Sequence, residues 1–188
     1  KPEIGQDELL ARVKLGHAMM MTLRGAPVVY YGDEQGFVGD GGDQLAREDM
    51  FPSKTAVYND NDLIGTDATT AQANFDQAHP IYRLVAEFAA LRKGHAALRK
   101  GRQVVRHYEQ EAGVFAASRF DPANGAEYLL VFNTAAAEKR VNVTLGYDAR
   151  AFETLAGTCP ATVTAPGSAA FTVPSFGWAV CRVSETAR

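Results

Sequence analysis

The sequence predicts two parts in succession: an α/β part built as helix–strand–helix, and an all-β antiparallel sandwich. Residues 27–31 are a short apolar run of β-branched and aromatic residues between glycines, typical of a strand buried on both faces of a parallel sheet. From residue 103 onward the apolar pattern changes to period two, and turn signals recur between short segments. That pattern is typical of antiparallel β-structure.

The composition is that of a packed globular protein. The chain has 188 residues, of which 46% are hydrophobic and 22% are charged, enough for one large domain or two small ones. The net charge of −3 is too small to argue for nucleic-acid or membrane partners, and no stretch is long and apolar enough to span a bilayer. We therefore expect neither kind of partner, and the cellular location stays open.

Residues 7–24 are predicted to form the first helix. Asp7 is a suitable N-cap, and Gly25 follows the last turn. The apolar side chains that recur at helical spacing are Leu9, Val13, Met20 and Leu23, and Leu10 and Met21 widen this stripe. His17 lies on the same apolar face, so we expect it to pack rather than to act as a ligand or a base.

Residues 27–31 are then expected to form one buried strand, followed directly by polar, glycine-rich sequence. The acidic pair Asp33 and Glu34 comes first, and a loop with several glycines continues to Gly42. Sequence of this kind at the carboxyl end of a parallel strand is where α/β barrels place their substrate loops. The alternative is an ordinary surface loop after a buried strand, and spacing alone slightly favours that alternative.

The next segment, residues 52–78, shows no convincing period. A long loop in a compact domain is usually functional or disordered, and a solvated insertion that touches nothing fits equally well. Residues 59–62 cluster Asn and Asp, but their spacing does not match an EF-hand loop, so we predict no metal there. Residues 80–93 carry the clearest helical stripe of the chain, with Pro80 at its start and Gly94 after its end.

The rest of the chain is expected to form about eight short strands in an antiparallel sandwich. They are residues 104–108, 114–120, 128–133, 140–145, 151–154, 161–164, 169–173 and 178–183. Tyr128 and Trp178 could form a platform for stacking a sugar ring, but aromatic residues in strands more often belong to the core. Cys159 and Cys181 could form one disulfide or be two buried thiols. Their low number favours free thiols.

The stretch from Gly25 to Phe51 resembles the eighth strand and following loop of the α-amylase superfamily of glycoside hydrolases. That family has Gly-x-Pro, two apolar residues, Tyr-Tyr-Gly-x-Glu-x-Gly, and then Asp-Pro-x-Asn-Arg with a Met or Phe. The matching residues here are Gly25, Pro27, Tyr30, Tyr31, Gly32, Glu34, Gly36, Asp43, Arg47, Met50 and Phe51. Gln44 and Ala46 stand where the family has Pro and Asn. Residues 88–101 are similar to the family's last barrel helix.

The resemblance implies a fold and a set of site residues. Residues 1–101 would be the C-terminal portion of a (β/α)8 TIM barrel, and residues 102–188 the β-sandwich that follows it. Asp43 and Arg47 would hydrogen-bond glucose units on the non-reducing side of the cleavage point. The residues implied to support the barrel rim are Tyr31, Asp33 and Glu34. The alternative role for Asp43 and Arg47 is a surface salt bridge that braces the loop.

No catalytic residue is expected in this chain. Retaining glycosidases need two carboxylates across the scissile bond, and the family's motifs for its catalytic acids, including Asn-His-Asp, are not in the sequence. Asp33 and Glu34 are adjacent, so on an extended segment they would point to opposite sides and could not flank one bond. Phosphate-binding glycine loops, nucleophile elbows and metal-ligand clusters are not found either. We expect no cofactor here, and the resemblance allows calcium in the missing part of the enzyme.

The resemblance therefore implies the C-terminal part of a retaining enzyme that acts on α-glucans such as starch or glycogen. The start at Lys1, without a methionine or a signal sequence, fits a segment cut from a longer enzyme. The expected partners are an α-glucan or oligosaccharide substrate and the N-terminal part of the same enzyme, and the chain alone should be inactive. The alternatives are a non-catalytic carbohydrate-binding or docking module and part of an α-glucan transglycosylase.

Overall fold

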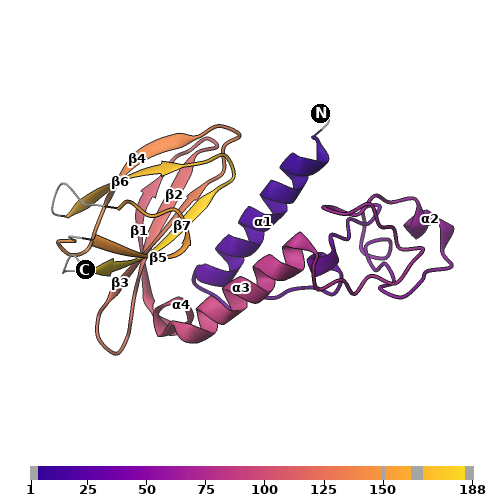
Figure 1. The fold of residues 1–188 in the computed structure, drawn as a ribbon, viewed down its shortest axis with the longest axis horizontal. Coiled ribbons are helices and arrows are strands. Elements are labelled where there is room, and N and C mark those ends of the chain that lie inside the picture. The colour runs from indigo at the N-terminus through magenta and orange to yellow at the C-terminus, as the bar shows by residue number, and fades with distance from the viewer. Residues whose placement is uncertain (1–3, 150, 162–166, 185–188) are drawn as a thin grey trace. The chain divides into compact units, whose positions relative to one another are not determined.

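The computed structural model describes residues 4–149, 151–161 and 167–184 (Figure 1). The chain divides into two compact units, and each is described by itself. The loop unit comprises Lys1–His17 and Pro27–Glu87, and the β unit comprises Ala18–Ala26 and Phe88–Arg188. Helices α1 (Gln6–Thr22) and α3 (Pro80–Gly94) each contribute residues to both units.

Both long helices predicted from the sequence are confirmed, to within two residues at each end. The apolar side chains of α1 that are almost fully covered are Leu15, Ala18 and Met21, and of these only Met21 belongs to the expected stripe. His17 is half-buried, and its Nδ1 lies 2.9 Å from the carbonyl oxygen of Val13, so its ring is held against its own helix. In α3 the expected stripe is buried, including Ile81, Leu84 and Phe88.

The buried strand expected at residues 27–31 is not formed, and this prediction is wrong. Residues 26–30 have no regular secondary structure and no ladder partner, and Val28 and Tyr30 expose 74% and 49% of their surface. A parallel strand needs neighbours brought from elsewhere in the chain, whereas every strand pair among the described residues is antiparallel. The helix–strand–helix unit of a barrel is therefore not seen in this structure.

Hydrogen bonds between side chains and the backbone stabilise the loop unit. Its short elements are η1 (Asp33–Gln35) and α2 (Ala56–Asn59). Buried Gln35 pairs through both ends of its amide with the backbone of Asp76, at 3.1 and 2.9 Å. Gly36 has a φ of +77°, and a Cβ there would lie 2.2 Å from the carbonyl oxygen of Ile64, so only glycine fits.

Residues 52–78 are not a solvated insertion. Leu63 and Thr70 are fully covered, and Asn74 exposes only 5% of its surface. Asn74 Nδ2 donates to two backbone carbonyls, those of Thr69 and Gln72, each at 3.0 Å. The missing periodicity in this segment thus reflects a loop packed by polar contacts, as expected when buried polar groups find partners.

The antiparallel β-structure predicted after residue 103 is confirmed. The described strands are β1 (Arg102–Tyr108), β2 (Val114–Phe120), β3 (Glu127–Asn133), β4 (Lys139–Thr144), β5 (Ala151–Gly157), β6 (Ser168–Val173) and β7 (Trp178–Ser184). They form a five-stranded sheet of order β1-β2-β3-β7-β5 and a two-stranded sheet, β4-β6 (Figure 1). The expected strand at residues 161–164 lies outside the described residues, apart from Ala161.

The two faces of the five-stranded sheet pack against different parts of the β unit. One face shares a core with β4 and β6, in which Leu129, Val131 and Phe171 are almost fully buried. On the other face Trp178 packs edge-on against Phe88, with 5.8 Å between ring centroids. Tyr128 exposes only 4% of its surface, and its hydroxyl lies 3.1 Å from His95 Nδ1. Tyr128 is thus a core residue rather than part of a sugar platform.

Two arginines hold residues 18–26 within the β unit. Arg119 exposes 1% of its surface and donates to the carbonyl oxygens of Thr22 and Gly101, at 2.9 and 3.1 Å. Arg92 donates to the carbonyl oxygens of Met21, Leu98 and Gly25, at 2.9, 2.6 and 2.7 Å. Carbonyls at the end of a helix lack partners within the helix, and cations bind them favourably. Burial nevertheless lowers the pKa of Arg119.

The expectation of two free thiols is also wrong, because Cys159 and Cys181 form a disulfide. Cys181 lies on β7, and Cys159 follows the end of the neighbouring strand β5. Their Cα atoms are 5.9 Å apart, within the usual range for a bridge. A separation of 22 residues in sequence does not reveal this closeness, because the pairing of β5 with β7 creates it. Among the described residues, no helix is both long and apolar enough to cross a membrane.

Candidate functional site

Four of the site residues predicted from the sequence meet around one pocket of the loop unit. We call it the Arg47 pocket, and it has a volume of about 400 Å³. Its lining residues are Tyr30, Tyr31, Asp33, Phe37, Val38, Gly39, Asp43, Ala46 and Arg47. Glu34, the fifth predicted residue, is not among them. It supports the neighbouring turn instead.

The turn that carries the two tyrosines is braced by the acidic pair. Asp33 Oδ2 accepts a hydrogen bond from the backbone N–H of Tyr30 at 3.0 Å. Glu34 Oε2 accepts one from the N–H of Gly32 at 3.1 Å. Gly32 has a φ of +93°, a conformation that glycine adopts without strain. The carboxylates thus fix the direction in which Tyr30 and Tyr31 leave the backbone.

The tyrosines form an exposed aromatic wall of the pocket. Their ring centroids are 4.6 Å apart and their planes are tilted by 38°. Partial burial raises the pKa of Tyr31, and the neighbouring Tyr30 and Asp49 raise it further, while Arg47 opposes them. The Tyr31 hydroxyl therefore stays protonated at neutral pH and remains able to donate a hydrogen bond.

Asp43 and Arg47 also line the pocket, and they form an ion pair with each other. Arg47 Nη2 donates to Asp43 Oδ2 at 2.6 Å, and this bond raises the pKa of Arg47. Their side chains are 80% and 56% exposed, so the pair contributes little to stability. A carboxylate that accepts and a planar guanidinium that donates suit a ligand rich in hydroxyl groups.

The two carboxylates that line the Arg47 pocket are held by the protein itself. Both carboxylates, Asp33 and Asp43, already accept hydrogen bonds from protein groups. Within the described ranges, no group of three or more His, Cys, Asp or Glu residues is arranged to hold a metal ion. Sequence reasoning missed Tyr30 and Phe37, because a strand buried on both faces was expected where the tyrosines are exposed.

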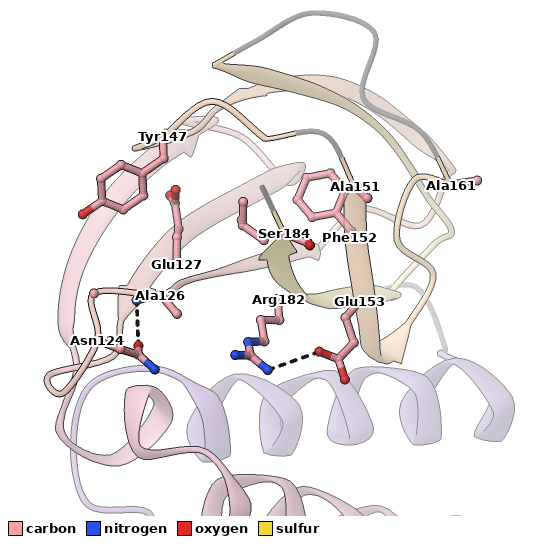
Figure 2. A pocket seen from close by; sticks show the side chains of 12 residues that line it. Asn124, Ala126, Glu127, Tyr147, Ala151, Phe152, Glu153, Ala161, Arg182 and Ser184 are labelled. Atoms are coloured by element: carbon pink, nitrogen blue, oxygen red, sulfur yellow. Dashed lines mark hydrogen bonds and ion pairs between the residues drawn. The ribbon is translucent and has the colours of Figure 1, made fainter. Parts of the chain in front are cut away.

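A second and larger pocket of about 790 Å³ lies in the β unit (Figure 2). Arg182 Nη1 and Glu153 Oε2 are 3.5 Å apart at its rim, and Asn124 Oδ1 accepts a bond from the N–H of Ala126. The carboxylate of Glu127 is fully buried, and the N–H of Gly146 donates to both of its oxygens. The charged groups of this pocket therefore already have partners within the protein. The sequence held no signal for it, because separate strands and turns line it.

Comparison with known proteins gives relatives of one kind. No protein-family model matches the chain. The chain is 42% identical to an α-amylase from Streptomyces lividans over 185 residues, which cover 94% of this chain and 20% of that protein. The chain therefore spans about a fifth of the length of this curated relative.

Solved structures show the same fold at lower identity. A γ-CGTase from the alkalophilic Bacillus clarkii superposes with a TM-score of 0.68 at 22% identity, over 94% of this chain and 24% of that one. A debranching enzyme from Nostoc punctiforme gives a TM-score of 0.61 at 20% identity, over 93% and 29%. A trehalulose synthase from Pseudomonas mesoacidophila gives 0.61 at 17% identity, over 93% and 38%.

Proposed function

Since the chain belongs to the α-amylase family of glycoside hydrolases and transglycosylases, we propose that it serves as the C-terminal portion of a retaining enzyme acting on α-glucans. In this proposal the chain supplies substrate-binding residues and the β-sandwich, and the catalytic carboxylates lie outside it. Support comes from the 42% identity to an α-amylase of which this chain spans only 20%. The catalytic motifs expected of the family are not in the sequence.

The observation that carries the proposal is the clustering at the Arg47 pocket. Residues 17 positions apart in sequence, Tyr30 and Arg47, line one pocket together with Asp43. Aromatic rings cover the apolar faces of sugars, and a carboxylate beside a guanidinium binds sugar hydroxyl groups in both directions. A site of few polar groups beside aromatic walls is the usual form of a small-ligand site.

The rest of the active site would come from the N-terminal part of the same enzyme. That part would hold the nucleophile and the general acid that retaining cleavage requires, and calcium, where the enzyme uses it, would bind there. The chain alone is then inactive towards α-glucans. Its partners in this proposal are the N-terminal part and an α-glucan or oligosaccharide.

The test is the substitution Arg47→Ala in the enzyme that carries this chain. We expect KM for a long α-glucan to rise about tenfold, the loss expected for one charge-assisted hydrogen bond. KM for a short oligosaccharide should rise much less, because a short ligand need not reach the pocket. Steady-state kinetics on both substrates measure the difference.

A matched control is Arg140→Ala. Arg140 is 83% exposed and lies 3.9 Å from Glu138, so it is also a surface arginine beside a carboxylate, but in the β unit. Its KM values should equal those of the parent enzyme. Equal increases in KM for the long and the short substrate with Arg47→Ala would contradict a substrate-binding role for Arg47.

A non-catalytic carbohydrate-binding module is the second candidate. It is favoured by one observation, that all lining residues of the Arg47 pocket come from the loop unit of this chain. Retention of the 188-residue chain on amylose together with unchanged KM values in the Arg47→Ala enzyme would support the module, whereas the rise in KM for the long α-glucan would support a part that works within the enzyme.

A further inference from the structure

We infer that Phe51 and Phe75 form an aromatic subsite of the loop unit, separate from the Arg47 pocket, that stacks on the glucose rings of an α-glucan. The inference rests on the proposed function and deepens it. Neither phenylalanine lines the Arg47 pocket. The subsite would bind about one additional glucose unit of the glucan for each phenylalanine ring.

The first support is the exposure of two large aromatic side chains at one place. Phe51 exposes 70% of its surface and Phe75 exposes 52%. Their ring centroids are nevertheless only 5.0 Å apart, with the planes tilted by 58°. Single exposed apolar residues are ordinary, but a contiguous apolar patch marks a binding surface.

The second support is the rigidity of the backbone that carries the pair. The N–H of Asn74 donates to the carbonyl of Met50 at 2.8 Å, which joins the residue before Phe51 to the residue before Phe75. The N–H of Ser53 donates to the carbonyl of Thr70, also at 2.8 Å. Asn74 and Thr70 are buried. The rings are therefore presented by fixed backbone, which lowers the entropic cost of binding.

The third support is continuity with the Arg47 pocket. Asp49 lies close enough to Tyr31, a pocket residue, to raise its pKa. Asp49 also accepts a hydrogen bond from the Ser53 hydroxyl at 2.8 Å, and Phe51 lies between these two residues in sequence. Two residues span at most about 7 Å of chain. The pocket residue Arg47 and Phe51 are four residues apart in sequence, so at most about 14 Å of chain joins the pocket to the phenylalanine pair.

The chemistry fits an α-linked rather than a β-linked glucan. Glucose rings present C–H groups on their faces and hydroxyl groups on their edges, and aromatic faces carry the negative potential that attracts C–H groups. Two rings tilted by 58° form a bent surface. α-1,4-Linked chains curve, whereas β-1,4-linked chains are flat, so the bent surface favours the former.

The test compares maltoheptaose binding to variants of the 188-residue chain by titration calorimetry. We expect Phe51→Ala and Phe75→Ala each to weaken binding about fivefold, within the range known for one aromatic contact. Phe51→Leu and Phe75→Leu should weaken it equally, because leucine keeps an apolar side chain but removes the aromatic face. Tyr108→Ala should change nothing, since Tyr108 is 68% exposed but lies on β1. Cellohexaose should bind at least tenfold more weakly than maltoheptaose.

Every outcome is decisive for the subsite. Parent-like binding by the phenylalanine variants, with binding lost in Arg47→Ala, would overturn the subsite and leave the proposed function standing. Full binding by the leucine variants, or equal binding of cellohexaose, would overturn it too. A dimer seen by sedimentation that Phe51→Ala dissolves would assign the patch to a second copy and overturn it. An unsubstituted chain that does not bind at millimolar maltoheptaose would also overturn it, while the KM test on the enzyme still decides the proposed function.

Discussion

Different interactions stabilise the β unit and the loop unit. In the β unit every described strand has an antiparallel partner, and a core that includes Val114, Leu129 and Phe171 is closed between the sheets. The loop unit has only short elements between its long helices, and buried amides such as those of Gln35 and Asn74 hold its backbone. Four of its aromatic residues, Tyr30, Tyr31, Phe51 and Phe75, are exposed.

This difference explains where a ligand can bind. The apolar side chains of a sandwich core pack against one another, and several buried polar groups of the β unit are also paired, as with Glu127 and Ser118. A loop held by polar contacts needs few apolar residues inside. Tyr30, Phe51 and Phe75 therefore stay exposed, where they can make the ligand contacts that we propose. The comparison predicts large stability effects in the β unit and binding effects in the loop unit.

The largest difference should come from two apolar truncations. Leu129→Ala removes a fully buried side chain from β3 and should lower the free energy of unfolding by about 2–5 kcal/mol. Val28→Ala removes a side chain that is 74% exposed and should change it by less than about 0.5 kcal/mol. Urea unfolding followed by circular dichroism measures both. Similar losses for the two variants would remove the contrast between the units.

Removal of the disulfide should have the next largest effect on the free energy of unfolding. Replacing Cys159 and Cys181 together by alanine should cost the β unit about 2–4 kcal/mol, because the unfolded chain loses its cross-link. Maltoheptaose binding should stay unchanged, since neither cysteine belongs to the loop unit. Mass measurement before and after alkylation first checks the bond itself. Two alkylated cysteines in the unreduced protein would speak against the bridge.

Acidification should lower the free energy of unfolding of both units by a smaller amount. Burial lowers the pKa of His79 in the loop unit and of His95 in the β unit. The unfolded state then binds protons that the folded state refuses, so stability is present above about pH 6.5 and is lost as the pH falls below it. Protonation would also disturb two contacts, the bond from the Ile81 N–H to His79 Nδ1 and the contact of His95 Nδ1 with the Tyr128 hydroxyl.

The measurement is urea unfolding at pH values on either side of this point. His79→Gln and His95→Gln should each flatten the loss of stability on acidification. Stability that rises on acidification, or that falls equally in both variants and the parent, would contradict the burial argument.

The sequence predicted the parts of the fold that local patterns determine. Seven of the eight period-two segments became strands within three residues of their expected ends, the eighth lying mostly outside the described residues, and the stripe of α3 was found buried at Ile81, Leu84 and Phe88. Residues 27–31 failed because a parallel strand depends on neighbours that no local pattern supplies. The bridge between Cys159 and Cys181 was missed for a related reason, since the pairing of β5 with β7 decides it.

The candidate site was predicted in part, by residue type and by spacing. Asp43 and Arg47 were found together four residues apart, as a carboxylate and a guanidinium on one turn often are. Tyr30 and Phe51 were named only as matches to the family pattern, and Phe75 was not named, because exposure is a property of packing and a hydrophobic residue in sequence is first expected inside.

Hydrogen exchange with and without maltoheptaose tests the account most directly. Without ligand, amides of β3 and β7 should exchange slowly and amides of residues 27–31 quickly, because only the former are held in a ladder. With maltoheptaose, protection should increase at residues 30–51 and around residue 75, and nowhere in β1 to β7. Protection gained in the strands of the β unit, or slow exchange of residues 27–31 in the free chain, would contradict the account.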